Sequence, residues 1–140
     1  MPMQSQTDLE IIGTGTNVTA FEEPVIGKIK FLDSPQDVLE FVAGDSVEET
    51  IVISRGGTTT FMAPALASGV RALITLQGSP QSHLGILSRE FGIPCIMSVA
   101  FSAGVSTDRG ETIPADGTVV RLDVSGSDSA TVFLNMEDAL

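Results

Sequence analysis

The sequence predicts a single α/β domain built around a mixed sheet. Short β-branched, apolar runs typical of buried strands alternate with segments that begin and end at helix-capping residues. Some predicted strands follow one another directly and others are separated by a helix, which favours a mixed sheet. The 140 residues are enough for one domain with a substantial core. Because the chain has seven Phe and neither Trp nor Tyr, this core must consist of Val, Ile, Leu and Ala.

The N-terminal part of the chain contributes one predicted strand. Residues 1–10 are polar and are expected to form a flexible terminus, followed by a single domain over residues 11–140. Residues 11–21 have no regular period and are interrupted by glycines, so we predict irregular structure there. Residues 25–32 alternate between apolar and polar side chains, which predicts a strand.

Two helices and a buried strand are predicted next. Ser34 is a suitable N-cap and Pro35 suits the first helical position, so a short helix is expected from Gln36 to Val42. Residues 50–54 are apolar and β-branched, which predicts a buried strand. The threonines at 58–60 are expected to cap a helix that continues to Ser68.

The remaining chain is predicted to alternate between strands and turns around one helix. A buried strand over residues 70–76 leads into a loop of small polar residues, and a helix begins at His83 and stops at Gly92. The other predicted elements are a strand at 95–99, a loop with a helical turn at 100–109, a hairpin turn at Asp116-Gly117, and a hairpin of strands 119–124 and 130–134 around Gly126.

Composition excludes several classes of function. The net charge of −11 with seven basic residues argues against nucleic-acid binding and against an anionic membrane surface. No signal peptide or membrane-spanning run is visible, so we expect a cytoplasmic protein. The only cysteine, Cys95, excludes an internal disulfide, and it is predicted to be a buried apolar residue. One Cys and one His cannot build a His/Cys metal site. A carboxylate-only magnesium site stays open but has no recognisable spacing in the sequence, so no metal-ligating residue is assigned.

The single histidine, His83, is the strongest candidate for chemistry. Its predicted place is the N-terminus of a helix, where free backbone N–H groups and the helix dipole favour an anion. A neutral imidazole is also a nucleophile. Together these properties suit a histidine that carries a phosphoryl group.

The residues around His83 resemble those of a known family. Ser82-His83, Ile86, Arg89-Glu90 and Gly92-Ile93-Pro94 look like the signature of the phosphohistidine swivelling domain of PEP-utilising enzymes, which include pyruvate phosphate dikinase, PEP synthase, rifampin phosphotransferase and phenylphosphate synthase. Weaker matches extend over residues 18–134. The resemblance implies a three-layer β/β/α swivelling fold in which His83 is transiently phosphorylated.

The resemblance also implies supporting roles around the phosphoryl group. Ser82 is expected to cap the helix and to help position the histidine or the phosphate, and Gln81, Gly78 and Thr75 are expected to support the phosphate. Arg89 has two open interpretations: a salt bridge that anchors the helix, or charge support for the phosphate or a partner. The chain departs from the family pattern in two places.

Those departures are Gln81, where a threonine is usual, and Leu84-Gly85, where two alanines are usual. They bear on the contacts to the phosphate more than on the histidine itself. A glycine inside a first helical turn also costs up to about 1 kcal/mol.

The function implied by the resemblance is that of a phosphoryl-carrier subunit that is inactive alone. The chain is expected to bind no cofactor, while an ATP-grasp-like partner subunit would bind ATP or PEP with Mg²⁺. The acceptor would be a small molecule, either a phenolic compound, as in phenylphosphate-synthase-type systems, or pyruvate. Two alternatives remain open: a non-catalytic swivelling small subunit of an aconitase-type dehydratase, and a regulatory protein that retains the fold.

Overall fold

The computed structural model describes residues 9–44, 47–55, 62–78 and 83–135. Within these ranges the main sheet closes into a barrel of strand order β1-β5-β4-β3-β2-β8-β9, and β6 and β7 form a separate small hairpin. The strands are β1 Leu9–Asn17, β2 Val25–Phe31, β3 Thr50–Ser54, β4 Ala72–Thr75, β5 Cys95–Phe101, β6 Val105–Ser106, β7 Thr112–Ile113, β8 Val119–Asp123 and β9 Ser129–Asn135. The predicted α/β class with a mixed sheet is confirmed.

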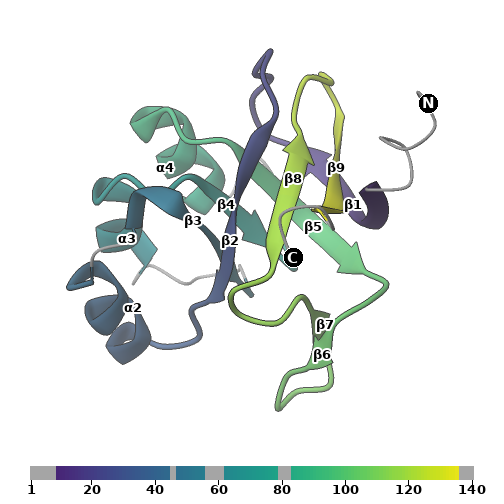
Figure 1. Ribbon diagram of the computed structural model, residues 1–140. Helices are drawn as coiled ribbons and strands as arrows, with labels where there is room; N and C mark the ends of the chain where they lie inside the picture. Colours follow the sequence, from purple (N-terminus) through teal and green to yellow (C-terminus); the bar gives the residue numbers. More distant parts are fainter. Residues whose placement is uncertain (1–8, 45–46, 56–61, 79–82, 136–140) are drawn as a thin grey trace.

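Parallel and antiparallel pairing divide the barrel into two parts. Strands β2, β3, β4 and β5 run parallel to one another, whereas every pair that includes β1, β8 or β9 is antiparallel. The helices connect the parallel strands and pack together on one side of the barrel (Figure 1). They are α2 Pro35–Val42, the short 3₁₀ helix Val47–Glu49, α3 Ala63–Ala67 and α4 His83–Phe91.

Two hydrophobic cores follow from this arrangement. Alternate residues of the parallel strands point to opposite faces, so that Ile74 faces the barrel interior and Leu73 faces the helices. The interior core consists mainly of Ile, Val and Ala from the barrel strands. The second core joins Val38, Leu66 and Leu84, one from each helix, to the outer side of the same parallel strands. As predicted, both cores lack Trp and Tyr, and Cys95 is fully buried in the second one.

Local signals for helix ends agree with the structure. The Ser34 hydroxyl accepts a hydrogen bond from the Asp37 backbone N–H at 3.1 Å, and proline stands at the start of α2. At the end of α4, Gly92 has a φ of 66°, and the Ile93 N–H donates to the Ser88 carbonyl at 2.9 Å. This is the arrangement of a Schellman cap, which requires a residue that tolerates a positive φ. Helix α3 begins at Ala63. The threonines at 58–60, which the sequence predicts as the cap of this helix, lie outside the described residues.

The prediction of irregular structure over residues 11–21 is wrong for its first part. Residues 9–17 form β1, which closes the barrel by pairing with β5 and β9. A Cβ atom on Gly15 would lie 2.5 Å from the Met97 carbonyl oxygen, and one on Gly13 would lie 2.9 Å from the Val99 side chain. The glycines therefore permit a close strand approach rather than breaking the strand. Of the predicted flexible terminus, residues 1–8 lie outside the described residues, and Leu9 and Glu10 belong to β1.

The chain after β5 also differs from its prediction. No helix is found over residues 100–109, all of which are described. Strand β5 continues to Phe101, residues 105–106 pair with 112–113 in the β6–β7 hairpin, and the Gly110 N–H closes a single turn on the Thr107 carbonyl at 3.0 Å. Asp116-Gly117 does form a turn, with Gly117 at a φ of 91°, but β7 pairs with β6 rather than across this turn with β8. The Asp116 carboxylate instead accepts a hydrogen bond from the Phe31 N–H at 2.9 Å. The predicted hairpin of β8 and β9 is confirmed.

Within the described residues, no helix is both long enough and apolar enough to span a membrane.

Candidate functional site

His83 lies at the carboxyl edge of the parallel strands. It is the first residue of α4, which follows β4 in the chain, as the sequence predicts. The first backbone N–H groups of a helix have no partner within the helix, and ligands of α/β sheets commonly bind at this edge. Of the predicted supporting residues, Gln81 and Ser82 lie outside the described residues. The structure therefore places the backbone of His83 where an anion would be favoured.

Gly78 lies at this edge and is held by a residue of β5. It has a φ of 117°, which favours glycine, and it is exposed. Its carbonyl oxygen accepts a hydrogen bond of 2.6 Å from the hydroxyl of Ser98. The sequence predicted Gly78 as a supporting residue but gave no sign of Ser98, which is 20 positions away.

Thr75 is the last residue of β4 and is fully buried. Its neighbour two positions back, Leu73, faces the helices, so the alternation of the strand places Thr75 on that face as well. Its Oγ1 has no hydrogen-bond partner among the described residues. A buried hydroxyl without a partner costs about 1–3 kcal/mol. The end of β4 therefore holds an unused polar atom beneath the helix layer.

Arg89 lies in the last turn of α4 and is exposed. It is six positions after His83, or roughly 9 Å along the helix axis, so the two residues lie toward opposite ends of the helix. Its charge acts on the thiol of Cys95 at the start of β5. Burial raises the pKa of this thiol to about 12, although a hydrogen bond with Ser88 and the charge of Arg89 both act to lower it. At neutral pH Cys95 is therefore a protonated core residue.

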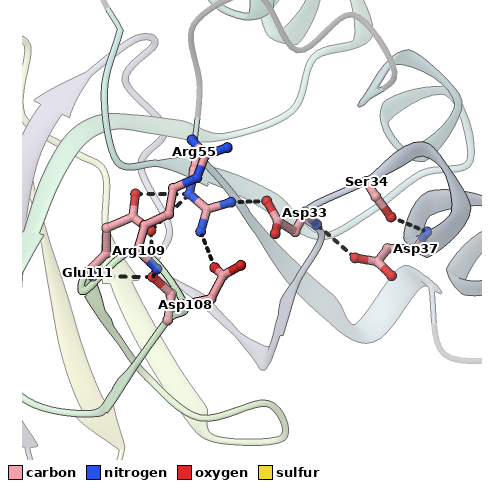
Figure 2. Close-up of polar contacts among 8 residues, drawn as sticks. Asp33, Ser34, Asp37, Arg55, Asp108, Arg109 and Glu111 are labelled. Atoms are coloured by element: carbon pink, nitrogen blue, oxygen red, sulfur yellow. Dashed lines mark hydrogen bonds and ion pairs between the residues drawn. The ribbon is translucent and has the colours of Figure 1, made fainter.

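A buried arginine forms the main charged cluster at this edge. The Arg55 side chain, 8% exposed, follows β3 and bonds three carboxylates from separate segments (Figure 2). Its Nη1 donates to Asp33 after β2, its Nη2 donates to Asp108 at 2.9 Å, and its Nε donates to Glu111 at 2.9 Å. The guanidinium also lies 5.3 Å from the ring centre of Phe31. The cluster thus joins the ends of β2 and β3 to the connection between β6 and β7.

The three carboxylates keep Arg55 charged in spite of its burial. Burial lowers the pKa of Arg55, but the hydrogen bond to Glu111 and the charges of Asp33 and Glu111 outweigh this effect, and the pKa is raised overall. The Arg55 carbonyl accepts from the Gln77 N–H at 3.0 Å, which connects the cluster to the chain leaving β4. The sequence analysis did not identify Arg55 or its cluster, whose one local signal is a charged residue directly after an apolar strand.

The surface beside this cluster is hollowed. A depression of about 440 Å³ is lined by Leu76 and Gln77 after β4, by residues 99–101 of β5, and by Glu111 and Thr112. In the part of the chain that is described, no group of three or more His, Cys, Asp or Glu side chains is placed to hold a metal ion. The carboxylates of Asp33, Asp108 and Glu111 instead form ion pairs with the guanidinium of Arg55.

Comparisons with known proteins agree with this architecture. The family model described as "PEP-utilising enzyme, mobile domain" matches residues 47–125, which run from the 3₁₀ helix beyond β8. A probable phosphoenolpyruvate synthase of Archaeoglobus fulgidus is 30% identical over 91 residues, which are 65% of this chain and 11% of that protein. The chain thus spans about a ninth of the length of this relative.

The matched segment contains His83, α4 and the parallel strands β3, β4 and β5, whereas the fourth parallel strand, β2, precedes it. It also contains Gly78, Thr75 and Arg89, as well as Arg55 and Ser98. The chain belongs to the mobile-domain family of PEP-utilising enzymes.

Proposed function

We propose that this chain is a phosphoryl carrier in which a ring nitrogen of His83 is transiently phosphorylated. The observation that carries the proposal is the position of His83 as the first residue of α4, inside the segment that matches the mobile-domain family. The barrel with its one-sided helix layer is, in this proposal, the three-layer β/β/α swivelling fold of that family.

The chemistry consists of two displacements at phosphorus. In the first, the His83 ring nitrogen attacks the donor phosphorus, an N–P bond forms, and the P–O bond to the leaving group breaks. The leaving group is ADP if the γ-phosphorus of ATP is attacked, or enolpyruvate if the donor is PEP. If the β-phosphorus of ATP is attacked instead, AMP leaves, and water then releases the γ-phosphoryl group as inorganic phosphate. In the second displacement, the oxygen of a phenol or of the pyruvate enolate attacks the same phosphorus, the N–P bond breaks, and the proton given up by the phenol hydroxyl or the pyruvate methyl group passes to a base. After the second step His83 is again unphosphorylated and can accept the next phosphoryl group.

The protein contributes position and partial charge to these steps. The free N–H groups at the start of α4 would bind the oxygens of the phosphoryl group, and the helix dipole would favour their negative charge. We propose that the phosphate is supported by Gly78, Gln81 and Ser82 from the chain between β4 and α4, and by Thr75 at the end of β4. Arg89, at the other end of α4, suits contact with a partner better than contact with this phosphate.

The donor and acceptor sites are proposed to lie on a partner subunit that is ATP-grasp-like. This partner would bind ATP or PEP together with Mg²⁺, because phosphoryl transfer needs cationic groups around the phosphates. The acceptor is proposed to be a phenolic compound or pyruvate. On this proposal the chain alone turns over no substrate.

The proposal is tested by phosphorylation with a labelled donor. The chain is incubated with its partner and either γ- or β-labelled ATP or labelled PEP, and His83→Ala and Ser102→Ala serve as variants. The wild type should acquire a label that is stable in base and lost in acid, His83→Ala should acquire none, and Ser102→Ala should be labelled like the wild type. A label that survives acid, or one that persists in His83→Ala, would contradict the proposal.

A further inference from the structure

Ser98 stands out because it combines an unfavourable backbone conformation with a short hydrogen bond. Its φ of 57° is the one positive φ of a residue other than glycine in the described chain. Residues with side chains rarely adopt this conformation, and such positions often occur near functional sites. Its hydroxyl donates to the Gly78 carbonyl oxygen at 2.6 Å.

The conformation of Ser98 follows from a bulge in β5. Opposite β1, Met97 pairs with Thr16 and Ala100 pairs with Thr14, so β5 advances three residues while β1 advances two. Bulges of this kind place their first residue in the left-handed region, where glycine is usual. Here that position is occupied by Ser98, and the glycine at the bulge is Gly15 of β1, on the opposite strand. A Cβ atom on Gly15 would lie 2.5 Å from the Met97 carbonyl oxygen.

The bulge lies beyond the last residue of β5 that pairs with β4. The pairing of β4 with β5 runs through Ile74 and Ile96, and β4 ends at Thr75. Ser98 therefore faces the chain that leaves β4 rather than a paired strand. A serine at this point supplies a hydroxyl that glycine would lack, and the hydroxyl holds Gly78, five positions before His83.

We propose that Ser98 is a positioning residue for the phosphorylated histidine. By fixing the Gly78 carbonyl, it sets where the chain leaves β4 and thus the approach to the first residue of α4. Ser98 acts through Gly78 and is not itself required to contact the phosphoryl group. This inference rests on the proposed carrier function of His83, but the bond it invokes can be measured without any phosphoryl transfer.

Two variants separate the hydroxyl from the backbone conformation. Ser98→Gly removes the hydroxyl and relieves the unfavourable φ, whereas Ser98→Ala removes the hydroxyl and retains the unfavourable φ. Ser98→Gly should therefore melt at a higher temperature than Ser98→Ala. The matched control is Ser102→Ala, since the Ser102 hydroxyl also donates to a backbone carbonyl at 3.4 Å, but that carbonyl belongs to Ile12 in β1 and not to the chain that leaves β4.

The first measurement is amide hydrogen exchange on the isolated chain. The Gln77 N–H, which donates to the Arg55 carbonyl, should exchange about tenfold faster in both Ser98 variants and at the wild-type rate in Ser102→Ala. The Leu73 N–H, which donates to the Pro94 carbonyl, serves as an internal reference. Wild-type exchange of Gln77 in both Ser98 variants would overturn the inference, whatever donor the protein uses.

The second measurement is the rate of His83 phosphorylation by the partner and labelled donor. Both Ser98 variants should be about tenfold slower, although their melting temperatures differ, and Ser102→Ala should match the wild type. A rate that follows melting temperature, with Ser98→Gly like the wild type, would show a purely structural role and overturn the inference. Absence of any label on the wild-type chain would instead refute the proposed function, and with it the role of Ser98 toward the histidine, even where the exchange result shows that Ser98 fixes Gly78.

Discussion

Arg55 is expected to be the largest single electrostatic contributor to the stability of this domain. Its guanidinium is buried, and it bonds three carboxylates of unequal exposure: Glu111 is 25% exposed, Asp33 is 38% exposed and Asp108 is 80% exposed. Replacement by methionine keeps much of the side-chain volume and removes every one of these bonds. The loss should come mainly from Glu111, because the two more exposed carboxylates can be rehydrated.

The size of the effect can be worked out from these exposures. A charge-assisted hydrogen bond to a mostly buried group contributes about 1.5–3 kcal/mol, and an exposed ion pair contributes at most about 1 kcal/mol. Arg55→Met should therefore cost about 3 kcal/mol. With about 2.1 cal/mol/K of unfolding entropy per residue, the 140-residue chain should then melt roughly 10 °C lower.

The assay is thermal and urea unfolding followed by far-ultraviolet circular dichroism, since the chain has no Trp or Tyr for intrinsic fluorescence. The matched control is Lys30→Met, which removes an exposed ion pair with Asp116 of 3.2 Å and should cost less than about 1 kcal/mol. In a double-mutant cycle, the double variant Arg55→Met/Glu111→Gln should have nearly the same free energy of unfolding as Arg55→Met, because the bond between the two residues is already lost. A loss below about 1 kcal/mol for Arg55→Met would refute the reasoning.

Three further predictions concern a thiol, an orphan hydroxyl and the surface charge. Cys95 should be inert to a thiol reagent at pH 8 until the chain unfolds, because burial raises the pKa of its thiol to about 12. The unfolded thiol ionises near pH 9, so its contribution to the free energy of unfolding is complete below that pH and falls by roughly 1.4 kcal/mol per pH unit as pH rises toward 12. Cys95→Ala should lack this fall in stability, and an equal fall in the variant would contradict the assignment. Thr75→Val should raise stability by about 1 kcal/mol, since its Oγ1 lacks a partner among the described residues, and should slow His83 phosphorylation if the hydroxyl serves the phosphate; an unchanged rate would remove Thr75 from the site. If the proposed donor subunit has a basic docking face, as the net charge of −11 on this chain favours, the association rate of the two should fall as salt rises. Surface-binding kinetics across a salt series would measure this, and a salt-independent rate would reject electrostatic steering.

The features that the sequence alone predicts are those with local causes. Ser34 and Pro35 start α2, Gly92 ends α4, and β-branched runs form β3 and β4, because capping and strand propensity act over a few neighbouring residues. The position of His83 at a helix start has the same local origin. The family resemblance around it depends on one short continuous motif, so it too is visible in the sequence.

The barrel closure and much of the site were decided by the tertiary structure. β1 has weak local propensity, and its glycines are explained only by the close approach of β5, which lies more than 80 positions away. The partners of Arg55 are 22, 53 and 56 positions away, and Ser98 reaches Gly78 across 20. Contacts across such separations depend on which strands become neighbours when both cores pack. No periodicity or capping signal within a single segment carries that information, so only the folded chain shows which residues meet at the carboxyl edge of the parallel strands.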